Sequence, residues 1–166
     1  EICKKNIDAS YLIAAKSSNK EILNKIKLII NKSEFKDKIL LLENREDIPN
    51  ILKSADLFLY ATPENSSDSL PRSLLEAQAA GIPTITTNTT GCNEIINHNQ
   101  TGLIVEYNKS EIAKASLKLI EDSNKSSQMA KNGYKNIRKK FNWDDMADKY
   151  EKKFLEIFEK YHNANL

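Results

Sequence analysis

The sequence has few of the residues that build disulfides, metal sites or catalytic triads. Its two cysteines, Cys3 and Cys92, lie far apart and neither belongs to a C-x-x-C pair, a pattern that favours free thiols over a disulfide or a zinc site. His98 and His162 are the only histidines, and neither has an evident acidic partner. The sequence therefore predicts no Ser-His-Asp triad and no protein-held metal.

Arginine and long apolar runs are also scarce. There are three arginines, Arg45, Arg72 and Arg138, and the net charge is only +2, so nucleic acid is not expected as a partner. No stretch approaches the roughly 18 apolar residues of a membrane span, and no signal peptide is visible. Neither G-x-G-x-x-G nor a P-loop is present, so the fingerprints of dinucleotide-binding proteins and P-loop ATPases are missing.

The remaining composition is that of a soluble globular protein. The chain has 166 residues, of which 40% are hydrophobic and 29% charged, enough for one domain with a sizeable core. We find no internal repeat and no linker, so residues 1–166 are expected to form a single domain. Because the chain begins at Glu1 and not at Met, we expect it to be part of a longer protein.

Short apolar runs alternate with helical patterns over the first two thirds of the chain, and the last third is wholly helical. This alternation predicts an α/β fold, a Rossmann-like parallel sheet with helices on both faces. The run at 39–42 is typical of a strand buried on both faces. Predicted strands cover 10–15, 39–42, 56–61, 83–87 and 103–105. Predicted helices cover 19–31, 48–55, 94–96, 108–121, 126–140 and 142–161, the last three forming a helical tail at about 108–162. Asn108 and Glu111 are expected to form a capping box at the start of the helix at 108–121.

The stretch 68–81, D-S-L-P-R-S-L-L-E-A-Q-A-A-G, organises the chain. It predicts a helix that Ser69 caps, with Pro71 in the first turn and Gly81 at its end. Asp68 then lies in the loop before the helix, and Glu76 lies in its second turn. Since a strand precedes this helix, its amino terminus is expected at the ligand-binding edge of the sheet, where a phosphate can bind.

Plainer interpretations stay open for each polar motif. Asp68 can be a simple cap, and an exposed pair of Arg72 with Glu76 would be worth only about 0.3–0.5 kcal/mol. The segment T-T-G-C-N-E at 89–94 can be an ordinary loop whose Asn93 caps the short helix. If it binds a ligand, its glycine permits close approach or a positive φ. The aromatic residues in F-N-W at 141–143 are expected to pack in the core.

Taken together, these motifs resemble the carboxyl-terminal domain of family-4 retaining glycosyltransferases with the GT-B fold. The resemblance covers nearly the whole chain and rests on the order of its motifs. These are I-P-N-I-L-K-S-A-D-L-F-L-Y (48–60), D-S-L-P-R-S-L-L-E-A-Q-A-A-G-I-P-T-I (68–85), T-T-G-C-N-E-I-I (89–96), Q-T-G-L-I-V (100–105) and the F-N-W terminal helix.

The resemblance implies roles for individual residues. The first acid, Asp68, would contact the hydroxyls of the transferred sugar, and the second, Glu76, the ribose of the nucleotide; both count as catalytic candidates. The resemblance also implies three groups of donor-binding candidates. Ser69, Leu70 and Pro71 would contact the diphosphate and sugar, and Thr90 and Gly91 would lie at the rim of the site. Glu43, Asn44 and Arg45 would lie beside the base.

The sequence departs from the family pattern at several points. Asp68 stands where glutamate is usual, and Ser69 where glycine is usual. The glycine-rich turn expected after the first visible strand is replaced by A-A-K-S-S-N-K at 14–20. The resemblance also implies that the family's first strand, its basic loop and an acceptor-binding domain lie upstream of Glu1. We therefore expect the 166-residue chain alone to bind donor weakly and not to turn over.

The expected function is that of the donor-binding domain of a glycosyltransferase. It would transfer a sugar from a nucleoside-diphosphate-sugar to an acceptor hydroxyl with retention, in polysaccharide or cell-surface glycan synthesis. No metal or other cofactor is expected to be required. The acceptor, a glycan or lipid-linked molecule, would be bound by the upstream domain, in the cytoplasm or at the inner face of the membrane with peripheral association through that domain. The alternatives are a non-catalytic nucleotide-sugar-binding module and an unrelated α/β interaction domain.

Overall fold

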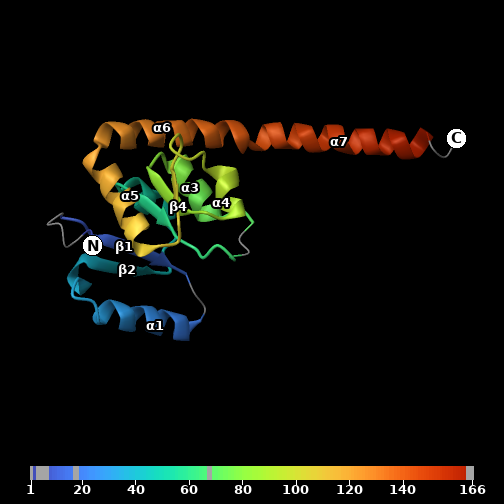
Figure 1. Ribbon diagram of the computed structural model, residues 1–166. Coiled ribbons are helices and arrows are strands. Elements are labelled where there is room, and N and C mark those ends of the chain that lie inside the picture. Colours follow the sequence, from blue (N-terminus) through green and yellow to red (C-terminus); the bar gives the residue numbers. More distant parts are fainter. Residues whose placement is uncertain (1, 3–7, 17–18, 67–68, 164–166) are drawn as a thin grey trace.

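The computed structural model describes residues 2, 8–16, 19–66 and 69–163. In these residues strands and helices alternate up to a fifth strand, and helices follow from there to the end of the described chain (Figure 1). The strands are β1 (Tyr11–Ala15), β2 (Ile39–Glu43), β3 (Phe58–Tyr60), β4 (Thr84–Thr87) and β5 (Leu103–Val105). The α-helices are α1 (Lys20–Asn31), α2 (Ile48–Lys53), α3 (Arg72–Ala80), α4 (Thr90–Ile95), α5 (Lys109–Glu121), α6 (Ser123–Lys140) and α7 (Trp143–Asn163), with a short 3-10 helix at Lys36–Lys38.

All the strands pair in parallel, as the sequence predicts, but they form two hydrogen-bonded groups. One group has the order β1-β2, with Tyr11 opposite Ile39. The other has the order β3-β4-β5, with Phe58 opposite Thr84 and Ile85 opposite Leu103. Because each parallel connection runs through a helix, the helices are brought onto the faces of the strands. The predicted α/β class with parallel strands is confirmed.

Alternating side chains of β3, β4 and β5 contribute to two apolar clusters on opposite faces of these strands. On one face, Phe58, Tyr60 and Ile104 pack with residues of α3, α4 and α6. On the other face, Leu59, Ile85 and Leu103 pack mainly with residues of α5. Buried Leu74 of α3 and Ile137 of α6 belong to the first cluster, and buried Leu119 of α5 and Met129 of α6 to the second. The central strands are therefore covered on both faces, as expected.

The first two strands are less buried than the sequence suggests. Leu40 of β2 is 53% exposed and Leu12 of β1 is 45% exposed. The prediction that residues 39–42 are buried on both faces is therefore wrong. The run is exposed because β2 has only β1 as a hydrogen-bonded neighbour among the described strands, which makes β2 an edge strand.

Several element boundaries differ from the prediction. The helix predicted at 126–140 starts at Ser123, because the Asp122 side chain accepts a hydrogen bond from the Lys125 amide. The strand predicted at 56–61 is limited to 58–60. Asn108 caps α5 as expected, but through the Ser110 amide at 2.8 Å. The full capping box is not formed, since the Glu111 carboxylate binds Lys114 instead.

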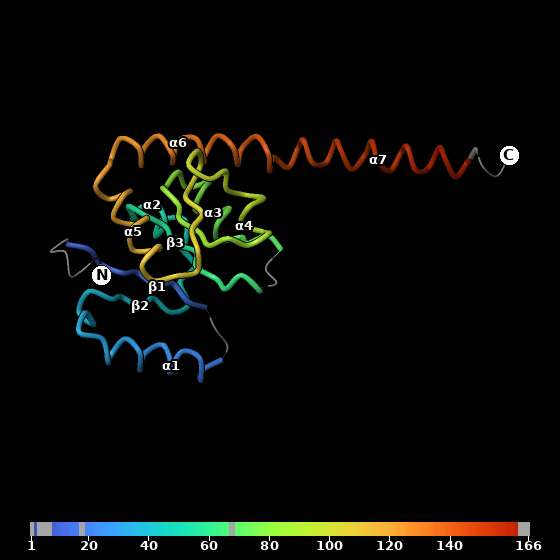
Figure 2. Tube along the Cα trace, viewed as in Figure 1, coloured from blue at the N-terminus to red at the C-terminus, as the bar shows by residue number. Residues whose placement is uncertain are grey.

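Helix α7 continues from the end of α6 and extends away from the body of the molecule (Figures 1 and 2). Trp143 at its start is 86% exposed, so the expectation of core packing is wrong for this residue. Phe141, just before it, does pack against the cluster that contains Leu74. No helix in the described part of the chain combines the length and apolar character that crossing a membrane requires.

Candidate functional site

The segments that leave β3, β4 and β5 emerge at one edge, since the three strands are parallel. The hydroxyl of Thr87, at the end of β4, joins two of these segments. It accepts a hydrogen bond from the Thr62 amide at 2.9 Å and donates one to the Thr62 carbonyl at 2.6 Å. The carboxyl edge of a parallel sheet is where α/β proteins bind ligands. A buried side chain thus fixes how the segment after β3 leaves this edge.

Helix α3 begins differently from the prediction. The residue that precedes the first helical turn is Pro71, with φ −69° and ψ 109°, and among the described residues no side chain makes a capping hydrogen bond to this helix. Ser69 therefore does not act as the cap, and Pro71 does not lie inside the first turn. The fixed φ of proline suits this entry, because Arg72 can then start the helix directly. Ser69 and Leu70 are exposed, whereas Pro71 is buried.

The start of α3 suits an anion. A helix amino terminus carries a partial positive charge and N–H groups that lack partners within the helix. Arg72, in the first turn, is exposed and has no ion-pair partner among the described residues. At the other end Gly81 has φ 73°, the left-handed conformation that ends helices, as predicted.

Glu76 lies in the second turn of α3, as predicted, and its side chain is exposed. Within the described part of the chain its carboxylate makes no hydrogen bond or ion pair, so the pairing with Arg72 that the plainer interpretation expects is absent there. Asp68 lies outside the described residues. Its position relative to Glu76 stays a prediction.

Thr90 and Gly91 lie in the first turn of α4, directly after β4. The prediction of a loop up to Asn93 and a helix from residue 94 is wrong, because the helix already starts at Thr90. Asn93 is consequently not the cap, and its side-chain Nδ2 donates to Asn88 Oδ1 at 3.0 Å. Of the glycines described, only Gly81 has a positive φ, so Gly91 is not a left-handed residue. The hydroxyl of Thr89, at the helix cap, is buried and has no hydrogen-bond partner among the described residues.

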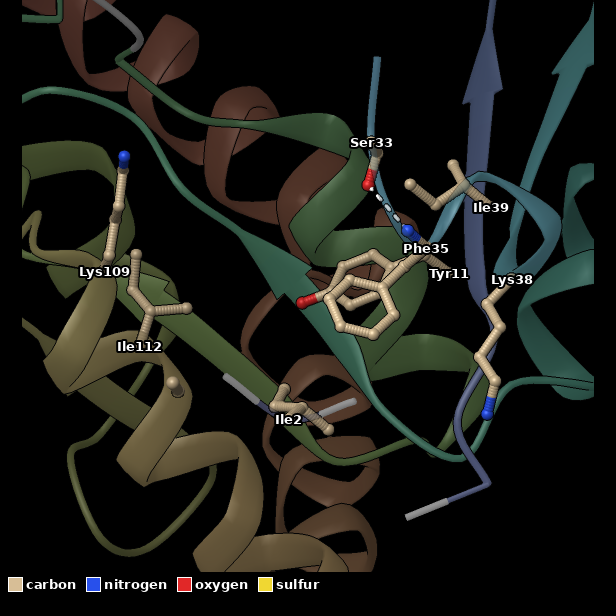
Figure 3. Close-up of a pocket in the computed structure, with 9 residues that line it drawn as sticks. Ile2, Tyr11, Ser33, Phe35, Lys38, Ile39, Lys109 and Ile112 are labelled. Carbon is tan, nitrogen blue, oxygen red and sulfur yellow. Dashed lines mark hydrogen bonds between the residues drawn. The ribbon is translucent and has the colours of Figure 1, made fainter. Parts of the chain in front are cut away.

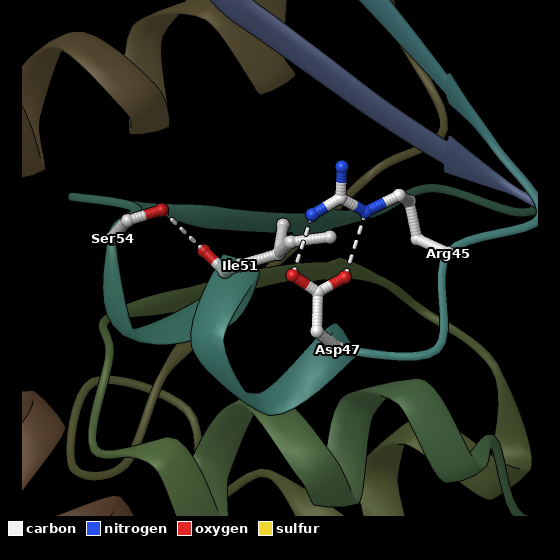
Figure 4. A network of polar contacts seen from close by, with 4 residues as sticks. All are labelled: Arg45, Asp47, Ile51 and Ser54. Carbon is white, nitrogen blue, oxygen red and sulfur yellow. Dashed lines mark hydrogen bonds and ion pairs between the residues drawn. The ribbon is translucent and has the colours of Figure 1, made fainter.

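The segment after β2 holds the residues predicted to lie beside a base. Glu43 forms an ion pair with Lys27 of α1 at 2.7 Å, and Asn44 takes a left-handed conformation with φ 53°. Arg45 makes two parallel bonds to Asp47, Nε to Oδ1 at 2.7 Å and Nη2 to Oδ2 at 2.6 Å (Figure 4). The hydrogen bonds from Arg45 lower the pKa of the Asp47 carboxyl, and those to Asp47 raise the pKa of Arg45.

The segment after β2 leaves from the carboxyl end of its strand pair, because β1 and β2 are parallel and Ala15 lies opposite Glu43. Each described candidate residue therefore lies at the end of β2 or in a segment or helix start that follows β2, β3 or β4. The exception is Glu76, which lies in the second turn of α3. It does not show the candidates closing around one ligand.

A polar hollow of about 520 Å³ lies at the edge formed by β3 and β5. It is lined by Glu64 and Asn65 from the segment after β3, and by Glu106, Tyr107 and Asn108 from the segment after β5. None of these five residues is among the site residues predicted from the sequence, although their place in segments that follow strands is a usable signal. In the described part of the chain no three His, Cys, Asp or Glu residues gather in a way that could hold a metal ion.

A second pocket, of about 430 Å³, is largely apolar and contains none of the candidate residues (Figure 3). Tyr11 and Ile39 line it, and they are the first residues of β1 and β2. Ile112 of α5 lies on its other side (Figure 3), and Ala113 of the same helix also lines the pocket. Because it opens at the amino ends of these strands, it lies away from Glu43 and Asn44, which follow at the carboxyl end of β2.

Comparisons with known proteins agree with this architecture. Residues 1–136 match the family described as "Glycosyl transferases group 1". The UDP-Gal:alpha-D-GlcNAc-diphosphoundecaprenol alpha-1,3-galactosyltransferase of Escherichia coli is 31% identical over 123 residues, which cover 74% of this chain and 31% of that enzyme. The chain thus spans less than a third of that relative's length.

Solved structures show the same fold. The Anabaena protein Alr3699/HepE in complex with UDP-glucose superposes with a TM-score of 0.77 and 18% identity, covering 89% of this chain and 41% of that chain. The C-terminal domain of the group 1 glycosyl transferase LpcC from Francisella tularensis superposes with a TM-score of 0.65 and 19% identity, covering 85% of this chain and 91% of that domain. The GT-B half-domain expected from the sequence is therefore the observed fold, and the chain belongs to the group 1 glycosyltransferases.

Proposed function

We propose that this chain is the donor-binding part of a glycosyltransferase. Such an enzyme breaks the bond between the anomeric carbon of a sugar and the diphosphate of a nucleotide. The anomeric carbon bonds to an acceptor oxygen instead, here with retention of configuration, and the nucleoside diphosphate leaves. The proton of the acceptor hydroxyl passes to the leaving diphosphate or to solvent.

The observation that carries this proposal is the start of α3. It follows β3 at the ligand-binding edge, no described side chain caps it, and exposed Arg72 lies in its first turn. A leaving diphosphate gains negative charge as its bond to the sugar breaks, and fixed positive groups stabilise that charge. Glu76, exposed one turn further on, offers a carboxylate to a hydroxyl beside the phosphate. This combination fits a nucleotide-sugar better than a free phosphate.

The remaining candidates take supporting roles in the proposal. Asp68 binds hydroxyls of the transferred sugar, and Glu76 binds the ribose. Backbone from Ser69 to Pro71 contacts the diphosphate and sugar, and the start of α4 at Thr90 and Gly91 forms the rim. The segment from Glu43 to Arg45 lies beside the base.

The wider setting is also part of the proposal. The acceptor is a glycan or lipid-linked molecule bound by a further domain, the product belongs to a polysaccharide or surface glycan, and the reaction runs in the cytoplasm or at the inner membrane face. No metal is required, because the helix terminus and basic groups stabilise the diphosphate. The Escherichia coli relative, named for a UDP-sugar and a diphosphoundecaprenol acceptor, supports this class of substrates.

A binding titration tests the proposal. The isotope-labelled chain is titrated with UDP-glucose, UDP-galactose and GDP-mannose, and backbone amide shifts are followed by NMR. We expect millimolar binding of at least one donor, with shifts at Arg72, Glu76 and Thr90 and none at Leu155 on α7. Uridine donors are tried first, because the superposed HepE structure holds UDP-glucose. Absence of shifts with all three donors would reject the proposal.

A substitution separates a working enzyme from a module that only binds. Asp68→Asn in the longest version of the protein that transfers sugar should abolish transfer, and Asp68→Glu should retain it. If both variants bind donor and act as the unmodified protein does, Asp68 has no catalytic role and the non-catalytic interpretation gains support.

A further inference from the structure

A buried amide lies on the same helix as Glu76. Gln78 of α3 has 0% of its surface exposed, a rare placement for a polar side chain. Its Nε2 donates to the hydroxyl of Thr84 in β4 at 2.6 Å and to the backbone carbonyl of Thr101 at 2.8 Å. One side chain therefore connects α3 to the central strand β4 and to the turn before β5.

A glycine on α6 provides the space for this amide. A Cβ added at Gly133 would lie 2.3 Å from Gln78 Oε1 and 2.8 Å from both Cδ and Nε2. Glycine is a poor residue for the middle of a helix, so its place in the middle of α6 needs a reason. Close packing of α6 against the Gln78 amide supplies that reason.

The turn before β5 also packs closely against Thr84, the residue whose hydroxyl binds the Gln78 amide. A Cβ added at Gly102 would lie 2.7 Å from the Thr84 hydroxyl and 2.9 Å from the Thr84 carbonyl. The orientation of the Gln78 amide is fixed as well, because exchanging its nitrogen and oxygen would bring two oxygens together at Thr101. Gln78, Thr84, Thr101 and Gly133 are called the amide joint below.

We infer that Gln78 is a positioning residue of the donor site, held by the amide joint; this inference rests on the proposed function. Apolar contacts are non-directional, so they specify the register and rotation of α3 less sharply than hydrogen bonds do. The two hydrogen bonds of Gln78 are directional and add that specification. They keep the start of α3 and Glu76 aligned with the ends of β4 and with α4.

The amide joint can be tested without any donor. In the unmodified chain, the side-chain NH₂ protons of Gln78 should exchange slowly with water, unlike those of exposed Gln128 on α6. Gln78→Met keeps the volume but removes both hydrogen bonds. We expect the variant to fold and to show changed amide shifts from Arg72 to Glu76. Fast exchange at Gln78, or unchanged α3 shifts in Gln78→Met, would overturn the inference.

Donor affinity tests the positioning role, with UDP-glucose as the probe. Gln78→Met should bind about 3- to 30-fold more weakly, the range typical of substitutions that act on a site through its surroundings. Gln128→Met is the matched control and should bind as the unmodified chain does. Equal affinity of Gln78→Met and the unmodified chain would overturn the inference. If the unmodified chain shows no binding, the proposed function fails, while the donor-free shifts still report on the amide joint.

A compensating pair separates positioning from stability. Gly133→Ala should lower both Tm and donor affinity, because its methyl group displaces the amide. Adding Gln78→Ala removes the clash and should recover part of the lost Tm, the remainder being the cost of leaving the Thr101 carbonyl without its buried donor. Binding should stay weak, since the hydrogen bonds are still absent. If the double variant recovers affinity together with Tm, Gln78 is only a packing residue. Slower exchange of the Gln78 NH₂ protons on saturation with UDP-glucose is expected in the unmodified chain, and no change would also contradict the inference.

Discussion

The guanidinium of Arg45 and the carboxylate of Asp47 face each other across two parallel hydrogen bonds of 2.7 and 2.6 Å (Figure 4). Both residues belong to the segment between β2 and α2, the segment proposed to lie beside the base. A two-point contact of this kind fixes the orientation of the guanidinium more firmly than a single bond does. Arg45 is therefore held along its own segment in the donor-free protein.

This pair predicts a pH response. Hydrogen bonds from Arg45 lower the pKa of Asp47 below its ordinary value of 3.8. A carboxyl whose pKa is lower in the folded state stabilises the fold above its unfolded pKa, and the contribution disappears as pH falls through the folded pKa. Carbon-13 NMR titration of the Asp47 carboxyl should give a midpoint below 3.8. In Arg45→Gln the midpoint should move upward, and an unchanged midpoint would contradict the assignment.

Glu76→Gln should weaken donor binding without affecting stability. The exposed carboxylate has no hydrogen-bonded or ion-paired partner among the described residues, so Tm should stay within about 1 °C, as for other surface changes. Loss of a charge-assisted hydrogen bond costs about 1.5–3 kcal/mol, or roughly tenfold or more in Kd. Titration with UDP-glucose measures this change in Kd. Glu121→Gln, exposed at the end of α5, is the control, and equal affinities of the two variants would exclude the role given to Glu76.

Phe141 and Trp143 should respond in opposite ways to truncation. Phe141→Ala removes a ring that packs against the Leu74 cluster, and we expect a loss of about 1–2 kcal/mol in the free energy of unfolding. Trp143→Ala should change it by no more than about 0.5 kcal/mol. Urea unfolding followed by circular dichroism measures both variants. Since Trp143 is the only tryptophan, its fluorescence in the unmodified chain should be that of a water-exposed indole, and a blue-shifted emission would show that α7 is covered.

Thr87→Val should destabilise the candidate site edge. The substitution keeps the shape of the side chain but removes the hydroxyl that binds both the amide and the carbonyl of Thr62. Leaving buried polar groups unpaired costs about 1–3 kcal/mol, and faster hydrogen exchange is expected at the Thr62 amide. Thr90→Val, at an exposed position of α4, is the control for stability. Equal unfolding free energies for the two variants would show that the Thr87–Thr62 link does not hold this segment.

Local patterns in the sequence were sufficient for the class of fold. The alternation of apolar runs with helical spacing predicted parallel strands and the order of elements, and Gly81 and Asn108 correctly predicted a helix end and a helix start. These features depend on backbone conformation and on near neighbours in the chain. Two helix starts were predicted wrongly because another nearby residue takes the position before the first turn. Helix α4 begins at Thr90 and not at residue 94, and Pro71 takes the cap position predicted for Ser69.

The candidate site was predicted only as a set of positions. Spacing placed Glu76 in the second turn of α3 and Arg45 after β2, and the structure confirms both places. Asp68 lies outside the described residues, so the pairing of the two acids stays a prediction. The spacing gave no sign that Arg45 binds Asp47, since a three-residue segment admits many side-chain orientations.

The α/β class, the parallel strands, the family resemblance and the helix that carries Glu76 all follow from the periodicity of the sequence and the order of its motifs. Which residues distant in the chain meet depends on the packing of the folded molecule. This packing brought Gln78 to Thr101 and Gly133, tied Thr87 to Thr62, left Leu40 at an edge and left Trp143 exposed on α7. These outcomes depend on how helices and strands pack, and no local pattern encodes the distance between side chains that are 23 or more residues apart.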